Sequence, residues 1–217
     1  MLAVVDRADV IPLFPLPLVV LPGEIVPLHV FEERYKTMIA DCRAGSGPAR
    51  PFGIALARGK EVHAAGCTVS IVEVMREYED GRLDIVTVGQ TRFRVRELFH
   101  DRPYHTAEVE YFGDRDEPVD AALRRRAIDA FDRLGRATAV PGAGTAVAGE
   151  RLASFRIGAG ALADPLEKQH LLELTSENER LGYLVEVLER LIAEHAEHSE
   201  AQKLAGSNGK LRTLRLP

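Results

Sequence analysis

Residues 12–35 constrain the fold of this chain more than any other stretch. Four prolines lie within the first eleven residues of this stretch, and each removes a backbone N–H group and fixes φ. A helix is excluded there, so we expect the segment to run extended along the edge of a sheet. Residues 21–23, Leu-Pro-Gly, predict a turn, and the apolar residues between Ile25 and Val30 predict a second strand. From Phe31 onward the apolar spacing becomes helical, which predicts the order strand, turn, strand, helix.

Residues 66–98 predict a long antiparallel hairpin. Asp80-Gly81 lies between its two arms, and this dipeptide favours tight hairpins because both positions tolerate positive φ. The apolar alternation changes phase near Ile71, which predicts a β-bulge there, and the returning arm repeats the change. Bends of this kind allow a sheet to close into a small barrel. Shorter strands are expected over residues 52–57 and 107–112.

Three arginines alternate with apolar residues in the returning arm of this hairpin. They are Arg92, Arg94 and Arg96, and Phe93 and Val95 lie between them. We therefore expect a half-buried strand with the arginines on its solvent face, offset there by carboxylates of neighbouring strands.

Only helices are expected after residue 113. Asp116, just before Glu117-Pro118, is the expected N-cap of the first helix, and residues 152–162 predict a second, short one. Capping patterns predict two more helices, one starting at Asp164-Pro165 and one at Ser176 with Glu179. The alanine- and glycine-rich residues 138–149 are expected to form a mobile connector.

Composition narrows the class of protein. Of the 217 residues, 46% are hydrophobic and 28% charged, as in ordinary globular proteins, and the net charge of −5 argues against a dedicated nucleic-acid binder. Cys42 and Cys67 lack close-spaced partners, so we expect free buried thiols and no zinc or redox motif. No run is long and apolar enough to span a membrane, and the amino end carries Asp6 and Asp9 where a signal peptide would carry basic residues, so we expect a cytoplasmic protein.

The opening stretch, from Pro12-Leu-Phe-Pro-Leu to Phe31-Glu-Glu-Arg-Tyr, resembles the start of the Lon protease N-terminal, substrate-binding domain. The similarity continues through residues 66–74, 88–95 and 167–174. The resemblance implies an α+β fold, in which a bulged, mostly antiparallel PUA-like pseudo-barrel is followed by a C-terminal helical bundle. We expect the barrel over residues 1–112, the bundle over 113–205 and a flexible basic tail over 206–217. The residues that match the family motif, expected to be mainly structural, are Pro12, Phe14, Pro15, Leu21, Pro22, Gly23, Pro27, Leu28, His29, Phe31, Glu32, Arg34 and Tyr35.

The sequence lacks the catalytic motifs of a full-length Lon enzyme. It contains no phosphate-binding loop ending in Gly-Lys-Ser or Gly-Lys-Thr, and no glycine-flanked serine with an identifiable lysine. We therefore expect a stand-alone member without the ATPase and protease modules, with no enzymatic activity and no cofactor. His195 and His198 lie beside Glu194 and Glu197, but a third fixed ligand is missing, so no metal site is expected.

Two other polar groups are interpreted as structural. His29 lies at a strand-to-helix junction, where we expect it to bond a backbone group or a carboxylate. A basic run formed by residues 124–126, Arg133 and Arg136 is interrupted by aspartates and has no interleaved aromatic residues. A solvated helix face is therefore favoured over a nucleic-acid interface.

The resemblance implies a non-enzymatic module that binds polypeptide segments, including unfolded or misfolded ones, and that could act as an adaptor to proteolysis. This function requires a contiguous exposed apolar patch on the barrel or at its junction with the helices. The alternative is a PUA-like receptor for a small molecule or RNA, which requires a deep pocket with convergent polar groups. An unrecognised hydrolase ranks third. The sequence leaves the oligomeric state open, a homodimer included.

Overall fold

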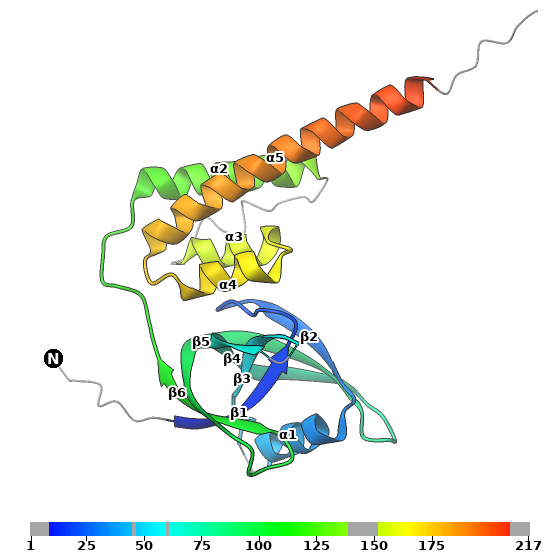
Figure 1. Cartoon of the computed structure of the whole chain (residues 1–217), viewed down its shortest axis with the longest axis vertical. Helices are drawn as coiled ribbons and strands as arrows, with labels where there is room; N and C mark the ends of the chain where they lie inside the picture. The colour runs from blue at the N-terminus through cyan, green and yellow to red at the C-terminus, as the bar shows by residue number, and fades with distance from the viewer. Residues whose placement is uncertain (1–8, 45–46, 60, 139–151, 209–217) are drawn as a thin grey trace, which may run out of the picture.

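A computed structural model describes residues 9–44, 47–59, 61–138 and 152–208 of the chain (Figure 1). The described residues form a sheet of six strands and five helices, which confirms the α+β class. In Figure 1, α1 lies at one end of the strands, and α3 and α4 lie between their other end and the pair α2 and α5. The expected connector falls almost wholly outside the described residues, as do residues 209–217 of the expected tail.

The strands pair in the order β2-β5-β4-β3-β1-β6, and a further pairing of β5 with β6 closes five of them into a ring. All pairings are antiparallel except that of β1 with β3, so the sheet is mostly antiparallel as expected. Strand β2 pairs with the outside of this ring through β5. The strands are β1 (Asp9–Leu16), β2 (Ile25–Val30), β3 (Phe52–Arg58), β4 (Glu61–Glu77), β5 (Leu83–Phe99) and β6 (His105–Tyr111).

The expectation that the proline-rich segment lies at a sheet edge is wrong, because β1 has a neighbour on each side. Its two pairings are staggered along the strand. Pro12 pairs with Thr106 of β6, whereas Pro15 pairs with Ala55 of β3. The two registers overlap at Leu13 alone. At each proline, β1 is therefore paired with only one of its two neighbours, so the missing N–H group interrupts no hydrogen bonds with the other neighbour.

The expected turn and hairpin are present. The Glu24 N–H group donates to the Leu21 carbonyl oxygen at 3.0 Å, and Gly23 adopts a φ of 78°, which glycine accepts without strain. Gly81, in the β4–β5 hairpin, has a φ of 80°. The β4–β5 register shifts between Ile71 and Glu73, as expected, and also near Cys67 and near Val74. These shifts bend both strands around the barrel.

The helices are α1 (Glu33–Arg43), α2 (Ala121–Ala137), α3 (Ala153–Ala161), α4 (Pro165–Glu173) and α5 (Glu177–Asn208). The expected caps of the last two are confirmed: Asp164 accepts from the Leu166 N–H group, and Ser176 accepts from that of Glu179. The expected cap at Asp116 is wrong, because Asp120 caps α2 instead. The Arg115 N–H group donates to the Thr175 carbonyl oxygen, and the Asp120 N–H group donates to the Asn178 side chain of α5, so the chain between them runs extended beside the start of α5.

One apolar cluster runs from the barrel into the helices without a break, joining residues such as Phe52, Leu21, Leu171 and Leu184. The leucine and valine side chains of α5 between residues 181 and 188 are buried, whereas His195 is exposed. Cys42 and Cys67 are free and buried, as expected. Burial raises the pKa of the Cys42 thiol to about 11 and the pKa of Cys67 to about 12. Among the described helices, none combines the length and apolarity needed to cross a membrane.

Candidate functional site

The solvent side of β2, the start of β5 and the end of β4 form a surface with several exposed apolar side chains, among which lies Glu73, the partner of Val86. We call this surface the β2–β5–β4 face. Cross-strand pairs place Ile25 beside Val88 and Pro27 beside Val86 on this side. Their sequence neighbour Val26 instead packs against the core, as the alternation of a strand requires. The apolar members of the face are Ile25, Pro27, Val72, Met75, Val86 and Val88.

Two register shifts in β4 add apolar side chains to this face. Ile71 and Val74 pack against the core, whereas Val72 and Met75, the extra residues at the shifts, turn to solvent. Met75 is 64% exposed, Val72 58% and Ile25 63%. Side chains this large and this exposed on neighbouring strands are characteristic of a surface that binds another molecule.

A polar cluster bounds the face at the end of β2. The Asp84 carboxylate accepts from His29 Nδ1 at 2.6 Å and from the Tyr78 hydroxyl at 2.8 Å. Both hydrogen bonds lower the pKa of Asp84, and the bond from His29 has the larger effect. Phe31 stacks on the His29 ring, with 5.9 Å between the ring centres, and remains 60% exposed. The cluster thus holds one exposed aromatic ring, that of Phe31, beside the β2–β5–β4 face.

The junction between barrel and helices holds buried charges that the sequence did not reveal. Arg92 was expected on a solvent face but is only 4% exposed. Its guanidinium donates to the carbonyl oxygens of Leu172 and Leu174 and to Asp114. The expectation is wrong because alternation in β5 orients Arg92 away from Phe93, and α4 covers that side. Arg94, which contacts the Phe112 ring, and Arg96, which pairs with Glu110, are more exposed.

Arg180 of α5 completes the junction network and is fully buried. It donates to the Ser154 hydroxyl at 2.8 Å, to Glu177 at 2.8 Å and to both carboxylate oxygens of Asp114. Burial alone would raise the pKa of Asp114, but the bonds and charges of Arg180 and Arg92 outweigh it and lower that pKa. Since every guanidinium has carboxylate or carbonyl partners, the charges are satisfied although water is excluded.

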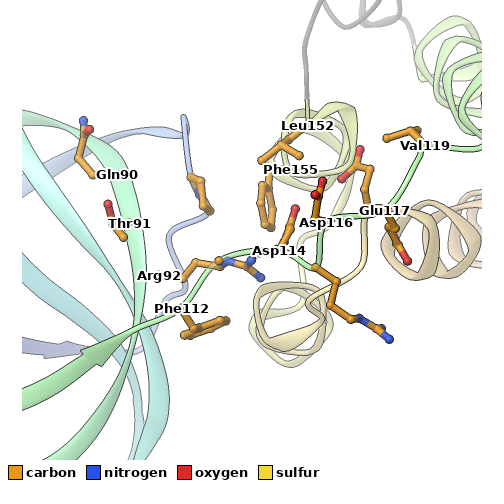
Figure 2. Close-up of a pocket in the computed structure, with 14 residues that line it drawn as sticks. Gln90, Thr91, Arg92, Phe112, Asp114, Asp116, Glu117, Val119, Leu152 and Phe155 are labelled. Carbon is orange, nitrogen blue, oxygen red and sulfur yellow. Dashed lines mark hydrogen bonds and ion pairs between the residues drawn. The ribbon is translucent and has the colours of Figure 1, made fainter. Parts of the chain in front are cut away.

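A groove lies on the solvent side of this network. It consists of two cavities of about 460 Å³ and 300 Å³ that share Pro22, Leu152 and Phe155. Figure 2 shows Arg92 reaching from the barrel toward Phe155, with the Phe112 ring beside Arg92 and with Asp116 and Glu117 beyond on the connecting segment. We call these two cavities the junction groove.

The described residues contain no cluster with the arrangement of a metal centre. Within that part of the chain, no group of three or more His, Cys, Asp or Glu side chains could hold a metal ion. His100 and His105 contact each other through their Nδ1 atoms at 3.0 Å on the surface. Arg133 of the basic run forms an ion pair with Glu189.

The comparisons with known proteins agree with this architecture. A family model described as the ATP-dependent protease La (LON) substrate-binding domain matches residues 10–190. The chain belongs to this family. The Lon protease of Anaeromyxobacter dehalogenans (strain 2CP-C) is 26% identical over 203 residues, which are 85% of this chain but only 24% of that protein.

Solved Lon N-terminal domains share the fold. A Lon N-terminal domain protein from Xanthomonas campestris is 28% identical with a TM-score of 0.63, and the match covers 82% of this chain and 97% of that one. The N-terminal domain of the Mycobacterium avium complex Lon protease has a TM-score of 0.63 at 17% identity, covering 86% and 100% of the two chains. The latter likeness concerns the fold alone.

The structure separates the residues of the Lon-like motif into two groups. Phe14, Leu21, Leu28 and Tyr35 are buried in the core. Pro27 and Phe31 are exposed on or beside the β2–β5–β4 face, His29 belongs to the polar cluster at the end of β2, and the others lie in β1, the turn or the start of α1. The motif therefore does not converge on one chemical site. The apolar residues of β4 and β5 that complete the face lie outside it, and only the phase changes of the hairpin signalled them.

Proposed function

We propose that this chain is a non-enzymatic module that recognises exposed apolar segments of polypeptides, as expected of a Lon substrate-binding domain. The single observation that carries the proposal is the β2–β5–β4 face, where Ile25, Val72 and Met75 are each more than half exposed. Folded client proteins bury their apolar residues, whereas unfolded or misfolded ones expose them. A binding surface of this kind would therefore distinguish unfolded from folded clients without reading a particular sequence.

The geometry of the face suits an extended client. Strand β2 stands at the end of the strand order, so its second edge has no strand beside it in the described sheet. An extended segment can add to such an edge through backbone hydrogen bonds and place alternate side chains on the apolar face. Pro27 lacks an N–H group, which limits how many bonds this edge can donate. Side-chain burial would then contribute more than backbone pairing.

The test is binding of an unfolded protein measured by fluorescence anisotropy. Labelled, reduced and alkylated α-lactalbumin serves as the unfolded client, and the native protein as its folded counterpart. We expect the chain to bind the unfolded form, and the double variant Ile25→Ser/Met75→Ser to bind at least about tenfold more weakly, since each substitution removes about 1 kcal/mol or more of apolar burial. Val10→Ser is the matched control, because Val10 is 58% exposed on β1.

Two results would contradict this proposal. Equal binding of the double variant and the wild-type chain would exclude the face as the contact surface. Tight binding of RNA or of a metabolite by a chain that ignores unfolded protein would favour the alternative receptor. Delivery of bound clients to a protease, and the cytoplasmic location that this requires, are further parts of the proposal.

A further inference from the structure

The junction groove has a continuous apolar floor. Both cavities are lined by Pro22, Leu152 and Phe155, so apolar side chains connect one cavity with the other. The Phe155 ring is fixed from behind, because the guanidinium of Arg180 lies 4.3 Å from its centre. Val119, 37% exposed, continues the apolar lining at the outer end of the larger cavity. Because Phe155 is only 2% exposed, Pro22 and Leu152 supply most of the apolar surface that a bound side chain could contact.

The larger cavity is negative at its solvent rim. Two arginines line this cavity. Arg92 forms an ion pair with Asp114 in the buried network, and Arg115 forms one with Glu179 at 2.5 Å. Glu117 accepts hydrogen bonds from the neutral side chains of Ser176 and Asn178, and it also interacts electrostatically with Arg115, so Asp116 contributes most of the negative charge at this rim. Asp116 is exposed beside it.

Among the described residues, the other carboxylates and cations around the groove do not remove this polarity. Asp114 and Glu177 are neutralised by Arg180 and Arg92 together. In the smaller cavity, Glu24 is neutralised by Lys168 at 2.5 Å, which leaves the exposed Arg156 as the charge at that end. The groove is therefore negative near Asp116, apolar in its centre and positive near Arg156.

We propose that the junction groove binds a polypeptide segment in which a large apolar side chain is adjacent to a lysine or arginine. The apolar side chain lies on the floor, and the cation lies at the rim formed by Asp116 and Glu117. A carboxylate at the same position would be repelled, so the groove selects by charge as well as by apolarity.

This assignment rests on the proposed function and refines it. Pro22 lines the groove, and Ile25 of the β2–β5–β4 face follows three residues later. Three residues of extended chain span at most about 11 Å, so one client segment can contact both surfaces. The face then supplies general affinity for apolar chain, and the groove favours segments with a basic residue.

The test uses three labelled ten-residue peptides with glycine-serine ends and a centre of Leu-Arg-Leu, Leu-Gln-Leu or Leu-Glu-Leu. Fluorescence anisotropy with the full chain gives the affinity of each. We expect the arginine peptide to bind about fivefold more tightly than the glutamine peptide, and the glutamate peptide to bind most weakly, with the differences shrinking as salt is raised. Asp116→Lys should reverse the order, and Leu152→Asn should weaken all three peptides.

Matched controls separate the groove from the rest of the surface. Asp129→Lys makes the same charge change at an exposed position of α2 outside the groove and should keep the wild-type order. Ile25→Ser/Met75→Ser, on the β2–β5–β4 face, should also keep it. Thermal melting establishes that each variant is folded.

Equal affinity for the arginine and glutamate peptides, or an unchanged order in Asp116→Lys, would overturn the assignment of the groove. The proposed function would survive that result if unfolded α-lactalbumin still bound the chain. If neither the peptides nor the unfolded protein bound, both proposals would fail.

Discussion

At the scale of single residues, the structure depends on charges that are buried and fully partnered. Arg180 and Arg92 hold Asp114 between the barrel and the helices, where Arg180 is fully buried and Arg92 is 4% exposed. Removing one member of such a group leaves the others buried without a partner, which costs about 3 kcal/mol or more. The contribution of this network therefore depends on each of its members being charged.

The network predicts a loss of stability in acid. Because the pKa of Asp114 is lowered by folding, its stabilising contribution is complete above the unfolded value, near pH 4, and disappears as pH falls through the folded value. Urea unfolding at a series of pH values should show this loss. In Asp114→Asn the chain should be less stable at neutral pH and should lose less stability below about pH 4. Identical pH profiles for the two proteins would contradict the role of Asp114.

The two cysteines give a second prediction at this scale. Burial raises the pKa of Cys42 to about 11 and that of Cys67 to about 12, so almost no thiolate exists near neutral pH. We expect neither thiol to react with a disulfide reagent while the chain is folded, and both to react at once in denaturant. Fast reaction of either cysteine in the native protein would show that its surroundings open to solvent.

At the scale of elements, the turn at residues 21–24 rests directly on β5. Gly23 donates to the Gly89 carbonyl oxygen at 2.9 Å, and Gly89 donates to that of Glu24 at 2.9 Å. A Cβ atom at Gly89 would lie 2.1 Å from the Leu21 carbonyl oxygen, so this strand position requires glycine. The contact places Pro22 across the smaller cavity from α3 and starts β2 in the register that builds the β2–β5–β4 face.

Gly89→Ala should therefore destabilise the chain by about 2 kcal/mol, since backbone atoms must move to admit the methyl group. Gly113→Ala is the matched control, because a Cβ atom there would meet nothing within 4 Å. Chemical denaturation of the two variants provides the comparison. Equal stability of both would contradict the close contact between turn and strand.

Elements whose causes are local could be predicted from the sequence. The Leu21–Gly23 turn, the Asp80-Gly81 hairpin, the bulge after Ile71 and the caps at Asp164 and Ser176 each follow from a few adjacent residues. What the sequence pattern missed depends on contacts between distant segments. The staggered pairing of β1 accommodates its prolines inside the sheet. Helix α4 buries Arg92, and a hydrogen bond from Asp120 to α5 places the start of α2 at Ala121.

The same distinction applies to the functional surfaces. The phase changes in the apolar pattern of β4 could be seen in the sequence. The exposure of Val72 and Met75 could not, because it depends on which side of the sheet the helices leave uncovered. The junction groove could not be predicted, since Pro22, Asp116 and Phe155 come from three separate elements or connections that only the fold brings together.

At the scale of the whole molecule, barrel and helices share one core and one ionic network. The apolar cluster continues from the strands through Leu21 into α3, α4 and α5, and Arg92 joins β5 to the helical part. We propose that the barrel and the bundle are subdomains of one cooperative unit. Thermal unfolding should therefore give a single transition, with equal midpoints from helical circular dichroism and from hydrogen exchange of the strand amides. Two separated midpoints would show that the parts fold independently.

The central claim is that the chain holds unfolded polypeptide on the β2–β5–β4 face, and hydrogen exchange of the complex tests it most directly. Amides of β2 and of residues 71–77 should exchange at least about tenfold more slowly when unfolded α-lactalbumin is bound, because the client covers the face and the free edge of β2. Amides at the exposed end of α5 should not change. Protection confined to α5, or a complex that leaves β2 and β4 unprotected, would contradict the account.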